Sequence, residues 1–205
     1  MISLQQIIDY LTQTYSPLSI LLYGSYADGT NNLHSDFDAL VISRHHAQHH
    51  DASFVGGVQL DVFVYPAAYF DSEYDCSDFV QLYDSRILLD THDIGNTLKC
   101  RVLEHLHNRP PKPEAEIRSN IDWCIKMSER VKRGDAEGMF RFHWVLIDSL
   151  EIFCDAMHHP YLGPKKSLRW MADTHPAAFA CYEKALKAFS EESLSGWITC
   201  LKSLL

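Results

Sequence analysis

Three prolines within four positions divide the chain into two halves with different hydrophobic patterns. Pro110, Pro111 and Pro113 lie in the segment NRPPKPE, residues 108–114, and they favour an extended linker because proline ends a helix. Before this segment, short apolar runs alternate with turn-rich stretches, whereas apolar residues recur at helical spacing after it. The sequence therefore predicts an α+β chain, with one domain at residues 1–108 and an α-helical bundle domain at residues 114–205.

The first half contains four apolar runs of strand length, and the second half contains five segments with helical periodicity. The expected strands are residues 18–23, 37–42, 58–65 and 86–89. Helices are expected at residues 94–107, 115–133, 136–158, 165–173, 177–189 and 191–204. The N-terminal stretch MISLQQIIDYL is expected to be an amphipathic first helix.

Composition restricts the location and the partners of the protein. The chain of 205 residues is 46% hydrophobic, yet it lacks the run of roughly 20 apolar residues that a membrane span needs. Its N-terminus has no basic start or cleavage site, so we expect a cytoplasmic protein. A net charge of -9 argues against a long nucleic acid as partner. The six cysteines form no CxxC pair and are expected to be reduced thiols.

Three aspartates on two expected strands suggest a metal site. Asp36 and Asp38 share one face of their strand because side chains alternate with a period of two. Asp61 lies in the apolar strand VQLDVFVY and shares that face if the two strands pair. Carboxylates held this close repel each other unless a cation lies between them, and oxygen ligands suit Mg²⁺. Together the three residues could hold two Mg²⁺ ions.

A glycine and a serine directly follow the first expected strand. Gly24 allows a tight turn and the close approach of a phosphate, and the Ser25 hydroxyl offers a hydrogen-bond donor. If a short helix begins at Ser25, its free N–H groups would also face the phosphate. We therefore expect Gly24 and Ser25 to bind a triphosphate.

The segment GSYADGTNNLHSDFD, together with a later aspartate on a neighbouring strand, resembles the DNA polymerase β-like nucleotidyltransferase superfamily. It is similar to the pattern of the minimal and antibiotic nucleotidyltransferases. The matching residues are Gly24, Ser25, Gly29, Thr30, Ser35, Asp36 and Asp38. The segment differs at Asn31, Asn32 and His34, where the family often has a basic residue.

The resemblance implies a nucleotidyltransferase fold, with a small mixed β-sheet flanked by helices, and Mg²⁺-dependent transfer of a nucleoside monophosphate. The nucleotide is expected to be AMP, supplied by ATP. Our first expectation for the acceptor is a small molecule such as an aminoglycoside, which would make the protein an antibiotic-resistance enzyme. The alternatives are AMP transfer to a partner protein in a toxin–antitoxin pair and a non-catalytic nucleotide-binding module. The sequence leaves a homodimer open.

The helical half carries a carboxylate stripe of its own. The helix MFRFHWVLIDSLEIFCDAM, residues 139–157, is apolar around most of its circumference and is expected to be buried. Trp144, Asp148, Glu151 and Asp155 nevertheless form one stripe along it. In antibiotic-modifying relatives a carboxylate from the helical part is the general base, which makes Asp148 or Glu151 a candidate beside Asp61. The alternative is an interhelical salt bridge to an arginine, for which the candidates are Arg118, Arg130 and Arg141.

Two further clusters admit a structural or a functional interpretation. Lys165 and Lys166 lie in the first turn of an expected helix, where cations oppose the helix dipole, so they are candidates for triphosphate binding. An ordinary solvated lysine pair is the alternative. The run HHAQHH, residues 45–50, is interpreted as a polar loop between strands, because it defines no metal-ligand geometry.

Overall fold

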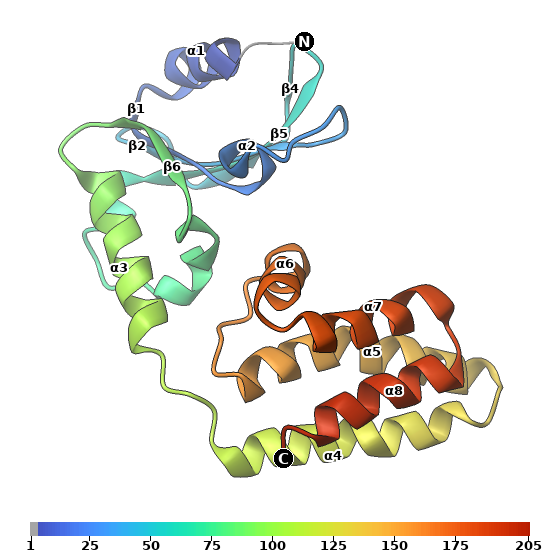
Figure 1. Ribbon diagram of the computed structural model, residues 1–205. Coiled ribbons are helices and arrows are strands. Elements are labelled where there is room, and N and C mark those ends of the chain that lie inside the picture. Colours follow the sequence, from blue (N-terminus) through green and yellow to red (C-terminus); the bar gives the residue numbers. More distant parts are fainter. Residues whose placement is uncertain (1–3) are drawn as a thin grey trace. The chain divides into compact units, whose positions relative to one another are not determined.

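The computed structural model describes residues 4–205, and its chain divides into two compact units, Met1–Arg109 and Pro110–Leu205 (Figure 1). The first unit combines a sheet with helices, and the second is built from helices alone. The expected fold class, a mixed sheet followed by helices, is confirmed. The first three residues of the expected N-terminal helix lie outside the described part of the chain.

The N-terminal unit follows the order of elements that the sequence predicted and adds short ones. Its helices are α1 (Leu4–Tyr15), α2 (Gly24–Asp28) and α3 (Ile94–Asn108), with 3-10 helices η1 (Ala67–Tyr69) and η2 (Cys76–Leu82). Its strands are β1 (Pro17–Leu22), β2 (Phe37–Ser43), β3 (His49–Asp51), β4 (Phe54–Val55), β5 (Val58–Pro66) and β6 (Arg86–Asp90). The four expected strands are confirmed as β1, β2, β5 and β6. Strand β3 begins inside the histidine run, so the prediction of a loop throughout that run was wrong at its end.

Within the described residues, the strands form a six-stranded mixed sheet in the order β3-β5-β2-β1-β6, with β4 paired to β5. Strand β2 lies parallel to β5 and antiparallel to β1, while β6 closes the other edge antiparallel to β1. The strands β2 and β1 are therefore central, which explains why they are nearly continuous apolar runs.

Each face of the sheet has its own apolar core. One face packs with α1 through residues such as Leu11, Phe37 and Val62. The opposite face packs with η2 and α3 through residues such as Leu40 and Phe79. Period-2 alternation along β2 and β5 therefore assigns Asp38 and Asp61 to the face of η2 and α3.

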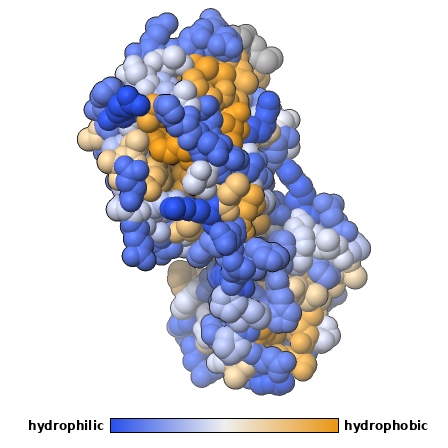
Figure 2. Space-filling model, turned by 90° about the vertical axis from the view of Figure 1, so that its left-hand side faces the viewer, coloured by the Kyte–Doolittle hydropathy of each residue, from blue (hydrophilic) through white to orange (hydrophobic). Residues whose placement is uncertain are grey.

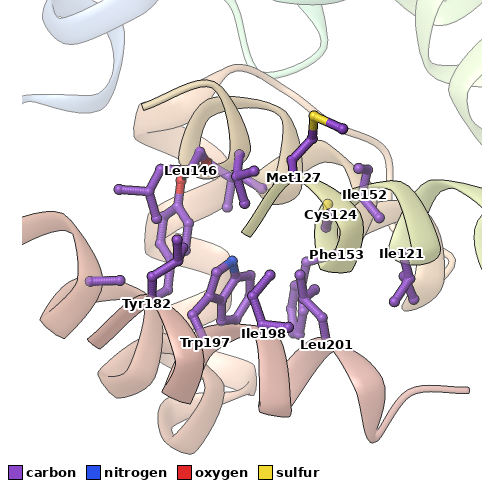
Figure 3. Packing of buried hydrophobic residues seen from close by; sticks show 14 of the residues in the cluster. Ile121, Cys124, Met127, Leu146, Ile152, Phe153, Tyr182, Trp197, Ile198 and Leu201 are labelled. Carbon is purple, nitrogen blue, oxygen red and sulfur yellow. Dashed lines mark hydrogen bonds between the residues drawn. The ribbon is translucent and has the colours of Figure 1, made fainter. Parts of the chain in front are cut away.

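The C-terminal unit consists, in the described chain, of α4 (Glu114–Val131), α5 (Ala136–Ala156), α6 (Pro164–Thr174), α7 (Pro176–Ala188) and α8 (Glu191–Lys202). Its helices surround one apolar cluster in which Trp197, Phe153 and Tyr182 lie close together (Figure 3). The Trp197 indole Nε1–H donates to Ser149 Oγ over 2.8 Å. The indole is therefore buried without leaving its polar atom unsatisfied.

The expectation that α5 is a buried helix holds for one side of the helix only. The helix buries ten residues, but Phe140 and Ile147 are 63% and 70% exposed. Together with the partly exposed Trp144, they form an apolar stripe on the outer face of the helix. The apolar residues around the circumference of α5 therefore do not all face the core of this unit.

Most of the visible surface is hydrophilic, with a hydrophobic area on the N-terminal unit and a smaller one on the C-terminal unit (Figure 2). Among residues 4–205, no helix is both long and apolar enough to cross a membrane.

Candidate functional site

The pairing of β2 with β5 brings two of the predicted aspartates together. Asp38 and Asp61 are direct partners in this parallel ladder. Neighbouring strands lie about 4.8 Å apart, and directly opposed residues point to the same side of the sheet. Both side chains are partly exposed, so the two carboxylates of this strand pair lie side by side and are accessible to solvent.

Gly24 lies against the Asp38 carboxylate. Its φ of +68° is in the left-handed region, and a Cβ added there would lie 2.1 Å from Asp38 Oδ2. Any side chain at position 24 would therefore displace that oxygen. The Tyr23 N–H donates to the Asp38 carbonyl oxygen over 3.0 Å, which fixes the backbone on either side of this contact. The glycine predicted to admit a phosphate thus lies directly beside the predicted metal ligand.

The loop that follows Gly24 is held by its own hydrogen bonds. The Ser25 carbonyl oxygen ends the short helix α2 by accepting from the N–H groups of Thr30 (3.0 Å) and Asn31 (3.1 Å). Asp28 Oδ1 accepts from Thr30 Oγ1 (2.6 Å), and Ser35 Oγ accepts from the Asn32 N–H (2.9 Å). The polar residues of the motif therefore order the loop, while α2 starts at Gly24, one residue before the expected position.

Asp36 differs from the other two aspartates. It immediately precedes β2 and is exposed. Among residues 4–205, no group of three or more His, Cys, Asp or Glu side chains is placed so that it could hold a metal ion. The structure thus brings Asp38 and Asp61 together by backbone pairing but does not assemble Asp36 with them into a three-carboxylate group.

The donor set of this pair nevertheless fits Mg²⁺. This ion is usually held by one or two protein carboxylates, while waters and substrate phosphates supply the other oxygens. Asp38 and Asp61 provide two carboxylates, and Gly24 leaves space that a side chain would fill. Asp36 lies two residues from Asp38 and is exposed, so it could add a further oxygen ligand once an ion is present.

Tyr23 is a neighbour of this pair that the sequence analysis did not identify. Burial raises the pKa of its phenol well above the usual value, and the negative charges of Asp61 and Asp38 raise this pKa further. The hydroxyl is protonated at neutral pH, as a tyrosine of ordinary pKa is too. No motif marks Tyr23, although its position directly before Gly24 could have suggested a role.

His50 is a second neighbour that the sequence analysis missed. Its Nε2 lies 2.6 Å from Asp61 Oδ1, and its ring stacks on Phe63 at a centroid distance of 4.6 Å. The sequence showed the histidine run, but it did not show that His50 pairs with Phe63 of β5, and this pairing places His50 at the site.

The helical candidates belong to the second unit. Asp148 is partly exposed and Glu151 is exposed, both on α5. Asp155, which belongs to the same stripe, is 8% exposed, and its Oδ2 lies 2.7 Å from Lys112 Nζ. The buried member of the stripe thus pairs with a lysine of the linker instead of an arginine.

Two of the three arginines proposed as salt-bridge partners of this stripe have other polar partners. Arg141 lies 3.3 Å from Glu137 and stacks on Trp144, and Arg118 donates to the Leu205 carbonyl oxygen. Lys165 is exposed and Lys166 is partly exposed in the first turn of α6. Both lysines therefore occupy the helix start that the sequence predicted.

Comparison with known proteins identifies the first unit. Residues 4–94 match the family model described as "Nucleotidyltransferase domain". A nucleotidyltransferase-like protein from Exiguobacterium sibiricum, of known crystal structure, is 13% identical with a TM-score of 0.43. That similarity covers 98% of this chain and 73% of the other. Curated proteins gave no match.

Proposed function

Residues 4–94 form a nucleotidyltransferase domain, so the protein is a transferase, and we propose that it moves AMP from ATP onto an acceptor hydroxyl. The observation that carries the proposal is the side-by-side placement of Asp38 and Asp61 with Gly24 packed against Asp38. Two carboxylates next to a glycine turn combine the ligands for a divalent ion with room for a phosphate.

The reaction breaks one phosphoanhydride bond of ATP and forms one phosphoester bond to the acceptor. The acceptor oxygen attacks the α-phosphorus, the bond between this phosphorus and the bridging oxygen breaks, and pyrophosphate leaves. The hydroxyl proton passes to a general base, for which Asp61, Asp148 and Glu151 are the candidates. Most of the catalysis would come from positioning and charge neutralisation.

The residues of the first unit divide these tasks. Asp38 and Asp61, with Asp36, would hold one or two Mg²⁺ ions, which when bound neutralise charge on the triphosphate and on the leaving pyrophosphate. Gly24 would let the phosphates approach the backbone, and Ser25 would donate to them. Tyr23, kept protonated, borders both carboxylates.

The roles proposed for the helical unit rest on the sequence and are to be tested by mutation. Lys165 and Lys166 would bind the triphosphate, and Asp148 or Glu151 would be the general base if Asp61 is occupied by metal. The acceptor that fits the chain best is a polycationic small molecule such as an aminoglycoside. A net charge of -9 attracts a polycation, and the same charge disfavours a nucleic acid.

The test follows the fate of the α-phosphate. Wild-type protein, Mg²⁺ and ATP labelled at either the α- or the γ-phosphate are incubated with a panel of aminoglycosides and, separately, with candidate proteins. Label from the α-position, but not from the γ-position, should appear on one acceptor, and Asp38→Asn should abolish the transfer. Transfer of the γ-label would identify a kinase and contradict the proposal, as would transfer that persists in Asp38→Asn.

A further inference from the structure

The pairing of β3 with β5 brings His50 to the carboxylate pair. His50 lies opposite Phe63 in this antiparallel ladder, two residues along β5 from Asp61. Phe63 and Asp61 share one face of β5, so His50 shares it as well. Its imidazole stacks on the Phe63 ring, with an interplanar angle of 20°. The ring plane is thereby fixed with Nε2 directed at Asp61.

The chemistry of the contact determines which atom carries the proton. A carboxylate oxygen only accepts hydrogen bonds, so the His50 Nε2 at 2.6 Å from Asp61 Oδ1 must be the donor. One oxygen of Asp61 is therefore occupied by a donor, and the other oxygen is left for a different partner. Asp38, the register partner of Asp61, lies on the same face of the neighbouring strand.

Stability alone gives little reason for this contact. The two side chains are 46% and 40% exposed, and pairs this accessible to water contribute little to folding. The adjacent His49 points to the opposite face of the sheet. Its Nδ1 lies 2.9 Å from the Ala47 carbonyl oxygen, and its ring contacts Tyr15. Of these two neighbouring histidines in β3, His50 is the one directed at a candidate ligand.

We propose that His50 is a positioning residue that holds Asp61 through Oδ1 and thereby presents its second oxygen to the divalent ion. Carboxylates that bind metals are commonly oriented by such hydrogen bonds, whose loss weakens metal affinity or activity by about 10–100-fold. The inference rests on the proposed function, because it requires Asp61 to be a metal ligand.

Two substitutions at His50 separate the hydrogen bond from the stacked ring. His50→Phe keeps an aromatic ring on Phe63 and removes the donor, whereas His50→Gln keeps a donor and removes the ring. His49→Phe is the matched control on the other face of the same strand. The affinity of the full chain for Mn²⁺, used as a paramagnetic probe, is measured by electron paramagnetic resonance in the presence of a non-hydrolysable ATP analogue. Thermal unfolding is recorded for every variant.

We expect His50→Phe to weaken Mn²⁺ binding by about 10-fold or more, with His50→Gln close to the wild type and His49→Phe unchanged. The melting temperature of His50→Phe should stay near that of the wild type. Unchanged or tighter Mn²⁺ binding by His50→Phe, while Asp61→Asn weakens it, would overturn the role of His50 and leave the proposed function intact. If neither Asp61→Asn nor Asp38→Asn affects Mn²⁺ binding, the metal site of the proposed function itself fails.

Discussion

The two units position their polar side chains by different physical means. In the N-terminal unit, Asp38 and Asp61 are brought together by the hydrogen-bonded register of two strands, so their separation is set by backbone geometry. In the C-terminal unit, Asp148 and Glu151 lie on an accessible face of one helix, while the helices pack around an apolar cluster. The comparison predicts that small substitutions at the carboxylate pair of the first unit lower the rate of transfer. Substitutions in the core of the second unit should instead lower the free energy of unfolding.

The largest effect on activity is expected from Asp38→Asn. The amide keeps the shape of the side chain but removes the charge that would hold the divalent ion, so transfer should fall by about 1,000-fold or more. Steady-state kinetics of AMP transfer measures the loss, and circular dichroism checks the fold. A loss under about 10-fold would mean that the charge of Asp38 is not part of the reaction.

The largest effect on stability is expected from Trp197→Ala in the second unit. Removing this fully buried side chain leaves a cavity and takes away the indole N–H that donates to Ser149 Oγ, which should cost about 3–5 kcal/mol. Urea unfolding of the full chain gives the difference. Ile147→Ala, at a 70% exposed position of α5, should change the free energy of unfolding by under about 0.5 kcal/mol. Equal effects of the two substitutions would show that the cluster around Trp197 is not the core of this unit.

A smaller effect, on activity in particular, is expected from Gly24→Ala. The added methyl group would lie 2.1 Å from Asp38 Oδ2 and displace it, and a displacement of about 1 Å can cost about 100-fold in rate. Gly29→Ala is the matched control: its φ of +74° gives similar backbone strain, but no atom lies within 4 Å of the new Cβ. If the two variants have similar kinetics, the loss of activity comes from backbone strain and not from the contact with Asp38.

The smallest effect is expected from Lys112→Met, which leaves Asp155 without its cation. A buried carboxylate that loses its partner should cost about 2 kcal/mol, whereas Lys132→Met, which breaks an exposed pair with Glu129, should cost little.

The hydrogen bond to Asp155 raises the pKa of Lys112 above its ordinary value of 10.5. Its stabilisation is therefore complete below about pH 10 and lost as the pH rises through the folded pKa. Urea unfolding of both variants at pH 7 and pH 11 measures the free energy that each ion pair contributes. A loss of stability in Lys112→Met that grows from pH 7 to pH 11 would contradict this pH dependence.

The sequence predicted those elements whose residues are apolar over a sufficient length. Strands β1, β2, β5 and β6 are runs of Leu, Ile, Val and Phe, and the helices of the second unit have clear periodicity. Strand β3, with the sequence HHD, and the two-residue β4 have no such run, and they are strands because they pair with β5. They depend on tertiary pairing, which a local pattern does not contain.

The same limit applies to the candidate site. The motif identified Gly24, Asp36, Asp38 and Asp61, since their chemistry can be recognised from residue type and spacing. The register of Asp38 with Asp61 follows from the parallel pairing of strands separated by the β3–β4 segment. The place of His50 beside Asp61 depends on the antiparallel pairing of β3 with β5. The exposure of Asp36 depends on where β2 begins.

The most direct test of the account is a double-mutant cycle on Asp38 and Asp61, with Mn²⁺ affinity in the presence of a non-hydrolysable ATP analogue as the readout. No acceptor is needed, so the measurement depends on the site alone. If the two carboxylates share one ion, each Asn substitution should weaken binding strongly, and the double variant should be weaker by much less than the product of the two losses. Strictly additive effects, or single variants that bind like the wild type, would contradict a shared metal site on β2 and β5.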